Sequence, residues 1–345
     1  MVDCTESKER QRRRPVVTLA VRAQLVSFAV GLLFLATSWS NTSTHRSLRE
    51  ETNAAIPPQI LPEVIEIVED LVAPFLEDQN RIYEFDANDG DDRPAMHTFF
   101  AVQGGQNGTI SQQDMETLAV WKHAWSKAGW KPRVLNIDHA QQYPRYDETI
   151  VRLKDVPMPE NDDYNRFCYL RHFAMAAVGG GWMSDYDTVP INMTANAVDF
   201  AELPNEAKFT TYQNYIPALL VGSAEEWERI AESLVQEGID SKENGRLRIA
   251  NGNNLFSDMF AMEALVGKRQ LITSEHKVGE ATQLPISEKG CRYINKRQKA
   301  IHFSHHSVSR IGFHLGKCRC RAYVMAETLR ELSTSCDYPD YISMS

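Results

Sequence analysis

The chain has 345 residues, of which 43% are hydrophobic and 24% are charged, enough apolar material for one large domain or two small ones. Its formal net charge of -9 argues against a general nucleic-acid-binding protein, because an acidic chain does not attract phosphate backbones. A nucleotide can still bind where a metal ion supplies positive charge locally.

The N-terminal segment has the pattern of a signal anchor. A basic cluster at residues 8–14 precedes an apolar run at residues 23–39, which is close to the shortest stretch that spans a bilayer. The charge on the N-terminal side predicts a cytoplasmic tail over residues 1–22 and a single-pass type II orientation. A cleaved signal peptide is the alternative, and both interpretations place the rest of the chain in the secretory pathway.

Two further features agree with a lumenal protein of the endoplasmic reticulum or Golgi membrane. Glycosylation sequons start at Asn41, Asn107 and Asn192. The six cysteines do not have the spacing of a zinc knuckle, so we interpret them as disulfide partners or buried thiols. The sequence leaves their pairing open.

A polar, acidic stem is predicted over residues 40–95, ahead of a catalytic domain over residues 96–345. Within the stem, residues 64–75 have apolar side chains at helical spacing, which predicts a short helix. The acidic residues 86–93 do not follow the ligand order of an EF-hand loop, and we interpret them as a solvated linker.

Strands and helices alternate along the predicted domain. Apolar runs predict strands at residues 97–102, 131–137, 182–184, 216–221 and 300–304. Apolar periodicity predicts helices at residues 113–128, 164–178 and 258–265, and another after Ser223, with Glu226 completing a capping box. The first of these helices carries Trp121 and Trp125, which we interpret as core residues. The strand–helix–strand opening predicts an α/β domain with a mostly parallel sheet flanked by helices.

Residues 165–190 carry the pattern on which the functional prediction depends. Gly179, Gly180 and Gly181 let a helix end and a strand begin. Asp185 and Asp187 follow that strand and would share one face of it, where their oxygens suit Mn²⁺ or Mg²⁺. The carboxyl end of a parallel strand is also where α/β sheets commonly bind ligands.

An isolated pair of aspartates is a weak signal, but its surroundings add to it. The helix with Arg171, the glycines, the short strand and the Asp-x-Asp resemble the DXD sugar-binding region of GT-A glycosyltransferases. The likeness is to the group of initiating α-1,6-mannosyltransferases and clostridial toxin glycosyltransferase domains, and it covers residues 96–316. Arg171 matches the arginine of that group's Asp-x-x-Arg helix, whereas Cys168 stands where its aspartate would be. His302 and Ser307 match the spacing of a C-terminal His and Ser, and His305 and His306 are rival ligands.

The resemblance implies a GT-A-like (Rossmann-like) fold and a retaining hexosyltransferase with no dedicated general base. It implies a UDP- or GDP-hexose donor and a glycan or glycoprotein acceptor. The catalytic residues would be Asp185, Asp187 and Arg171. The ligands of Mn²⁺ or Mg²⁺ would come from Asp185, Asp187, His302, His305 and Ser307. The donor would lie against Ala101, Val102, Gln103, Arg171, Gly180, Gly181 and Tyr186.

Two other classes of protein are compatible with the same residues. A metal-dependent phosphohydrolase or nucleotidyltransferase would need further acidic ligands at separate strand ends, and the sequence identifies none. A catalytically inactive nucleotide-sugar or glycan-binding protein is the second, and Cys168 in place of an aspartate is the feature that supports it.

Overall fold

The computed structural model describes residues 60–83, 92–102, 109–159, 162–195, 202–243, 248–250, 253–281, 284–294, 298–311 and 321–344. The chain divides into two units, residues 1–45 and 46–345, and every described residue belongs to the second. Within the described ranges, no helix is long and apolar enough to cross a membrane. The predicted tail and anchor (residues 1–39) and most of the predicted linker lie outside them.

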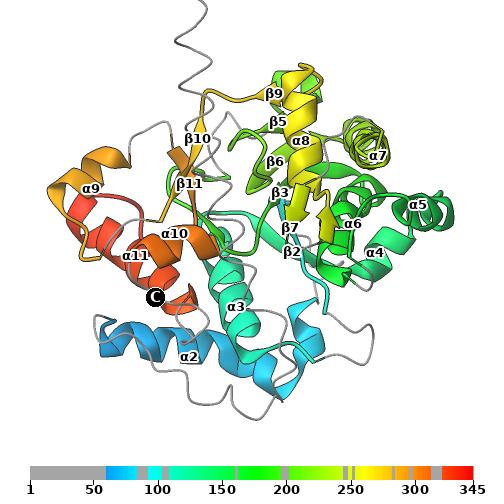
Figure 1. The fold of residues 1–345 in the computed structure, drawn as a ribbon. Helices are drawn as coiled ribbons and strands as arrows, with labels where there is room; N and C mark the ends of the chain where they lie inside the picture. The colour runs from blue at the N-terminus through cyan, green and yellow to red at the C-terminus, as the bar shows by residue number, and fades with distance from the viewer. Residues whose placement is uncertain are drawn as a thin grey trace, which may run out of the picture. The chain divides into compact units, whose positions relative to one another are not determined.

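A six-stranded mixed sheet forms the centre of this unit (Figure 1). Its strands in spatial order are β2 (Lys131–Leu135), β1 (Ala95–Phe99), β3 (Gly180–Ser184), β6 (Leu219–Ser223), β5 (Thr210–Thr211) and β9 (Ile272–Thr273). The pairs β2–β1, β1–β3 and β5–β9 are parallel, whereas β6 runs antiparallel to both β3 and β5. The predicted α/β class is confirmed, and the sheet is mixed because β6 opposes its neighbours.

Two smaller sheets complete the strand arrangement. One contains β10 (Lys277–Glu280), β11 (Gln298–His302) and β4 (Thr188–Pro190), and the other contains β7 (Arg248–Ala250) and β8 (Asn253–Leu255). In the three-stranded sheet, β10 and β11 are parallel and β11 and β4 are antiparallel. Only three residues separate β3 from β4, so the chain passes directly from the central sheet into this second sheet.

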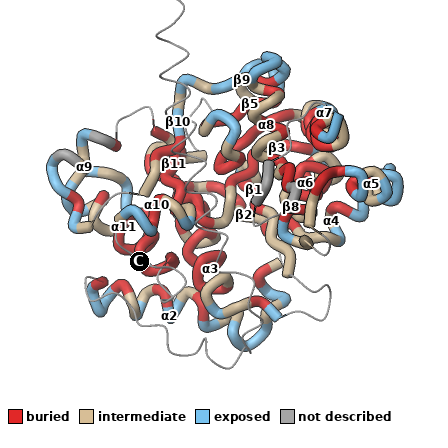
Figure 2. Tube along the Cα trace, in the orientation of Figure 1, coloured by how far each residue is buried: buried red, intermediate tan, exposed pale blue. Residues whose placement is uncertain are grey.

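Helices cover both faces of the central sheet, because its side chains alternate between two hydrophobic clusters. Trp182, Leu219 and Val221 face one cluster, and Met183 and Leu220 face the other. The first cluster includes residues of α2 (Pro62–Glu77), α3 (Gln112–Lys127) and α11 (Arg321–Cys336). The second includes residues of α4 (Ile137–Gln141), α5 (Tyr146–Leu153), α6 (Asp163–Ala177), α7 (Ala224–Asp240) and α8 (Asp258–Gly267). Figure 2 shows this burial along the central strands and the helices that pack on them.

The remaining described elements are short. They are the 3₁₀ turns η2 (Gln79–Ile82) and η5 (Asn205–Ala207) and the helices α9 (Glu288–Tyr293) and α10 (His305–Arg310). The predicted strands and helices of the domain are all confirmed, with ends that differ by at most three residues from those expected. Strand and helix ends fray, so shifts of this size are ordinary.

The helix after Ser223 is confirmed, but its capping box is not formed. Ser223 Oγ accepts a hydrogen bond from the Glu226 N–H at 3.3 Å, as an N-cap does. The Glu226 carboxylate instead accepts the N–H of Phe209 at 2.9 Å and pairs with Arg229. The Glu226 carboxylate therefore binds the backbone of Phe209, which precedes β5, instead of the backbone N–H of Ser223.

The helix predicted within the stem is α2, and it is part of the folded core. Val64, Val68 and Val72 lie one turn apart and are buried against the first cluster. The core therefore begins upstream of the predicted start of the domain at residue 96.

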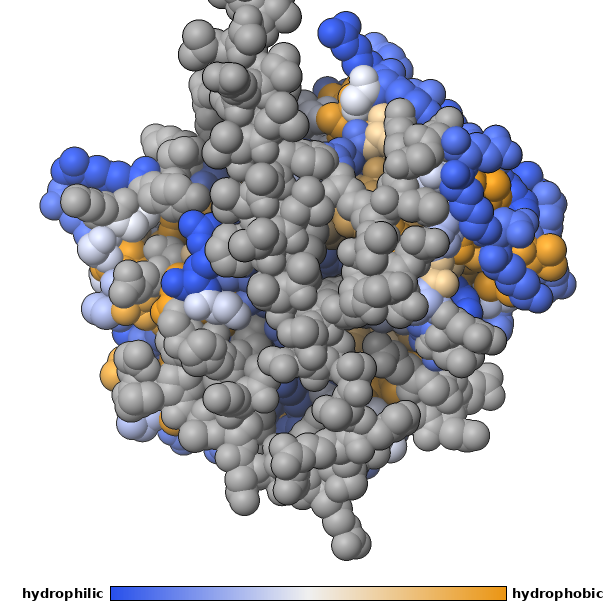
Figure 3. All heavy atoms as spheres, in the orientation of Figure 1, coloured by the Kyte–Doolittle hydropathy of each residue, from blue (hydrophilic) through white to orange (hydrophobic). Residues whose placement is uncertain are grey.

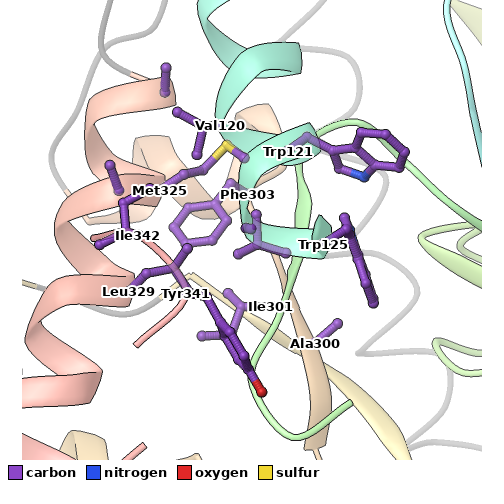
Figure 4. Close-up of a cluster of buried hydrophobic side chains, with 14 of the residues drawn as sticks. Val120, Trp121, Trp125, Ala300, Ile301, Phe303, Met325, Leu329, Tyr341 and Ile342 are labelled. Carbon is purple, nitrogen blue, oxygen red and sulfur yellow. The ribbon is translucent and has the colours of Figure 1, made fainter. Parts of the chain in front are cut away.

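α11 has no counterpart among the predicted elements, because its first half is buried on every side. The nine residues from Arg321 to Leu329 are all buried, including the polar residues Arg321, Glu327 and Thr328, so burial here does not follow an apolar stripe. Figure 4 shows Met325 and Leu329 from this helix beside Val120 of α3 and Phe303. Packing against α3 and α2, rather than an amphipathic stripe, stabilises this helix.

One disulfide joins the described cysteines at the C-terminal end. Cys291 in α9 bonds to Cys336 at the end of α11, across 45 residues of sequence. Cys168 is free and half-buried. The other three cysteines lie outside the described residues.

Salt bridges rather than apolar contacts mark the outer surface of α5 and α7. Arg145 pairs with Glu228 at 3.1 Å, and Arg152 pairs with Glu232. On the face drawn in Figure 3, the side chains over this edge are mostly hydrophilic. The Arg145–Glu228 pair is exposed and adds little stability by itself, whereas the Arg152–Glu232 pair is partly buried.

The turn from α6 into β3 requires glycine because the backbone approaches β6 closely. Gly179 and Gly180 have φ angles of 95° and 76°. A Cβ atom on Gly180 would lie 2.5 Å from the backbone nitrogen of Ala224, whereas a Cβ on Gly179 would meet nothing within 4 Å. The two positions therefore have similar backbone conformations but different space around them.

We expect Gly180→Ala to lower the free energy of unfolding by more than about 3 kcal/mol, because the methyl group would overlap fixed backbone atoms. Gly179→Ala, the matched control, should cost only about 1 kcal/mol from its positive φ. Chemical denaturation of the two variants measures both values. If both variants lost the same free energy of unfolding, the close approach to Ala224 would not explain the glycine at position 180.

Candidate metal centre

The two predicted aspartates lie in the connection between the central sheet and the second sheet. The N–H of Asp185 donates to the carbonyl of Ala218 at 3.0 Å, and the N–H of Thr188 donates to the Asp185 carbonyl at 2.9 Å. From the second sheet, the N–H of Phe303 donates to the carbonyl of Asp187 at 2.8 Å. The aspartates are thus in a turn rather than a strand, and backbone hydrogen bonds from both sheets fix that turn.

Three buried tryptophans hold the same stretch of chain from the side of α3. Their indole N–H groups donate from Trp121 to Ser184 Oγ at 2.9 Å, from Trp125 to the Thr188 carbonyl at 2.9 Å and from Trp130 to the Met193 carbonyl at 3.0 Å. Trp121 and Trp125 are fully buried, which confirms the prediction that they are core residues. Figure 4 shows them projecting from α3. The hydrogen bonds of Trp121 and Trp125 hold the residues just before and just after the turn, Ser184 and Thr188.

Pairing of β11 with β4 brings His302 to the turn, because His302 lies opposite Thr188. Ligand atoms of Asp185, Asp187 and His302 lie within 4.8 Å of one another. His302 Nε2 is 3.3 Å from Asp187 Oδ1, and its Nδ1–H donates to Gln213 Oε1 at 3.1 Å. This second hydrogen bond orients the imidazole in the way that is usual for metal-binding histidines.

The arrangement fits a divalent cation. Asp187 Oδ1 is buried and lies 3.3 Å from His302 Nε2, so a carboxylate oxygen and an imidazole nitrogen face each other at the centre. Two carboxylates and one imidazole form a donor set that binds first-row divalent metals such as Mn²⁺.

Arg171 links Asp185 to a third carboxylate. Its Nη1 lies 2.8 Å from Asp185 Oδ1, its Nη2 pairs with Asp258 at the start of α8, and its Nε donates to the Cys168 carbonyl at 3.1 Å. Asp258 also lies 3.4 Å from His172 Nε2. Asp258 thus supplies a carboxylate partner for Arg171 in a chain that has cysteine at position 168. It lies 87 residues from Arg171, and no local motif connects the two.

Arg321 is a second buried arginine at the centre, and the sequence offered no signal for it. It is the first residue of α11, and its Nη1 lies 3.1 Å from Asp187 Oδ2. Its guanidinium carbon lies 5.9 Å from the centre of the Tyr186 ring. Asp187 therefore meets a guanidinium on one oxygen and an imidazole on the other.

Burial and neighbouring charges push the pKa values of the cluster in different directions. Burial raises the pKa of Asp185 to about 6, although Arg171 acts against this. Burial also acts to raise the pKa of Asp187, but His302 and Arg321 outweigh it and the net pKa is lowered. Burial acts to lower the pKa of His302, yet the Asp187 carboxylate raises it overall. Asp187 is therefore the permanent negative charge of the cluster.

The predicted donor residues are divided between the two ends of β3. Ala101 and Val102 follow β1 at the same end as the turn, where the Phe100 ring meets the Tyr186 ring edge-on at 5.4 Å. Gln103 lies outside the described residues. Gly180 and Gly181 begin β3, so the length of the strand separates them from the cluster, and the packing described above accounts for the glycine at position 180. A donor contact at these two glycines stays a prediction.

Two other predicted metal ligands, His305 and Ser307, lie on α10, after β11. His305 begins α10 and is not among the three grouped ligand residues, and burial lowers its pKa to about 4. The Ser307 hydroxyl donates to the carbonyl of His302 at 3.2 Å, where it supports the end of β11. His305 is therefore outside the described cluster, and Ser307 as a ligand stays a prediction.

A protein-family model, described as a domain of unknown function (DUF8765), matches residues 88–289, which is more than half of the chain. The chain belongs to the DUF8765 family. The DUF8765 match contains Arg171, Asp185, Asp187 and Asp258, whereas His302 and Arg321 follow it. No curated protein matches the chain. The candidate centre therefore combines residues inside the family region with residues beyond it.

We expect Trp121→Phe to weaken Mn²⁺ binding, because the loss of the indole N–H frees Ser184 and the adjoining Asp185. The same change should lower the free energy of unfolding by about 1–3 kcal/mol, since a buried hydroxyl loses its donor. Isothermal titration with Mn²⁺ and chemical denaturation measure the two effects.

Trp130→Phe is the matched control for this variant. It removes an equivalent buried indole hydrogen bond, but its partner Met193 lies six residues beyond Asp187. We expect a similar loss of stability with nearly unchanged Mn²⁺ affinity. Equal Mn²⁺ affinities in the two variants would contradict a positioning role for Trp121.

Proposed function

We propose that this chain is a metal-dependent glycosyltransferase of the GT-A type. It would move a hexose from a UDP- or GDP-sugar to a glycan or glycoprotein acceptor. The convergence of Asp185, Asp187 and His302 carries the proposal, since the sequence predicted all three as ligands and their donor atoms lie within 4.8 Å. The mixed α/β sheet, with this cluster directly after β3, also supports it.

The metal chemistry of the proposal needs Mn²⁺ or Mg²⁺ at Asp185, Asp187 and His302. When bound, such a cation neutralises charge on a diphosphate leaving group. The close approach of a buried Asp187 oxygen to His302 Nε2 supports its presence. Asp187 is best suited to hold it, because the pKa of its carboxyl is lowered and the group stays ionised at neutral pH.

The other residues of the centre would bind and orient the donor. Arg171 is charged and fixed by Asp258 on one side, so its remaining donor groups face Asp185 and the reaction site. Phe100 and Tyr186 join the end of β1 to the turn and would form a wall of the donor pocket. We assign no general base, which agrees with a reaction that retains the anomeric configuration.

Hydrolysis of nucleotide sugars by the purified full-length chain tests the proposal. We expect Mn²⁺-dependent release of UDP or GDP from one of a panel of UDP- and GDP-hexoses, abolished by EDTA. Asp187→Ala should reduce the rate by about 10²–10³-fold, because it removes charge stabilisation at the leaving group.

Asp155→Asn is the control, since Asp155 is an exposed turn residue on the α5 side of the molecule. It should leave the rate unchanged. Binding of a nucleotide sugar without turnover would instead favour an inactive binding protein. Absence of both binding and turnover in a folded chain would contradict the donor site itself.

The proposal includes a type II anchor and a lumenal catalytic domain in the endoplasmic reticulum or Golgi. The disulfide between Cys291 and Cys336 supports an oxidising compartment.

We expect peptide mapping of protein alkylated in intact cells to find Cys291 and Cys336 linked and Cys168 as a free thiol, because only the first two are bonded. Cys168 is the internal control for over-oxidation during preparation. Alkylated Cys291 and Cys336 would place the domain in a reducing compartment and contradict this part of the proposal.

A further inference from the structure

Arg321 is a charged side chain whose hydrogen bonds are incomplete. It is buried, with its Nη1 on Asp187 Oδ2 at 3.1 Å, and its Nε has no hydrogen-bond partner among the described residues. A buried guanidinium normally has partners for its donors, because an unsatisfied charged group is costly. An open donor next to a candidate metal centre indicates that an anionic partner is missing.

The position of Arg321 also conflicts with a cation at Asp187. A divalent cation on the Asp187 carboxylate would face the guanidinium across the same group, and like charges repel strongly where water is excluded. Arg171 does not create the same conflict, because Asp258 balances its charge independently of the cluster. Among the described residues, Arg321 forms an ion pair with Asp187 alone, and the charge of Asp114 acts on it from outside ion-pair distance.

We propose that Arg321 is an exchangeable counter-cation of this centre. It neutralises Asp187 when the metal is absent, a divalent cation displaces it, and the displaced guanidinium then binds the diphosphate of the donor. This inference rests on the proposed glycosyltransferase function, because it needs both a cation and a diphosphate at the site. It predicts that metal and nucleotide bind cooperatively, since the nucleotide stabilises the displaced position of Arg321.

Mn²⁺ binding to the full-length chain, followed by electron paramagnetic resonance of the free ion, tests the exchange. We expect Arg321→Met to bind Mn²⁺ about tenfold more tightly than the unmodified chain, because the competing charge is gone. With Mn²⁺ at saturation, the same variant should bind UDP or GDP about tenfold more weakly, because one charge-assisted contact is lost. The exchange therefore predicts that the same variant binds Mn²⁺ more tightly and the nucleotide more weakly.

Arg330→Met is the matched control, because Arg330 lies on the same helix and pairs with Glu327 and Glu331 away from the cluster. Both affinities should stay unchanged in this variant. Arg321→Lys keeps the charge with a shorter reach, so we expect a smaller gain in Mn²⁺ affinity. It also provides the test if Arg321→Met does not fold.

The outcomes separate this inference from the proposed function. If the unmodified chain binds Mn²⁺ and Asp187→Ala abolishes that binding, the centre exists. Unchanged or weaker Mn²⁺ binding in a folded Arg321→Met would then overturn the exchange alone. If the unmodified chain binds no Mn²⁺, the metal centre and the exchange both fail.

Discussion

The turn between β3 and β4 is the constraint on which the candidate centre depends. Its three residues join two sheets, and backbone hydrogen bonds from Ala218 on one side and Phe303 on the other hold it. Sheets are rigid because their strands are hydrogen-bonded along their length, so a short link between two of them has little freedom. The backbone at Asp185 and Asp187 is therefore held in place, whereas the backbone of a long loop would be free to move.

Charge balance is the second constraint, because three carboxylates lie together and two of them, Asp187 and Asp258, are buried. A buried charge is tolerated only when it is paired. Here positive and negative side chains alternate. Arg171 lies between Asp258 and Asp185. Arg321 and His302 both pair with Asp187. The carboxylate that holds Arg171 comes from a different helix.

The hydrophobic pattern predicted those elements that have one apolar face. α7 buries one apolar side and leaves a polar side toward solvent, and its position follows from apolar spacing. α11 is buried over its first half, so its sequence has no such contrast. The apolar spacing of residues 64–75 predicts the helix α2. Spacing alone does not determine which part of the protein the apolar side of this helix packs against.

The sequence by itself determined the α/β class, the order of the main elements and the aspartates with Arg171 and His302 as candidates, because these depend on local spacing and residue chemistry. Only the tertiary structure decided which distant groups meet them. Asp258 and Arg321 reach the centre through packing of α8 and α11, across 87 residues from Arg171 in the first case. The antiparallel direction of β6 is likewise a tertiary result, since strand direction depends on the path of the chain between strands. Contacts between residues far apart in the chain have no local pattern, and so the closing partners of the site could be found only in the folded molecule.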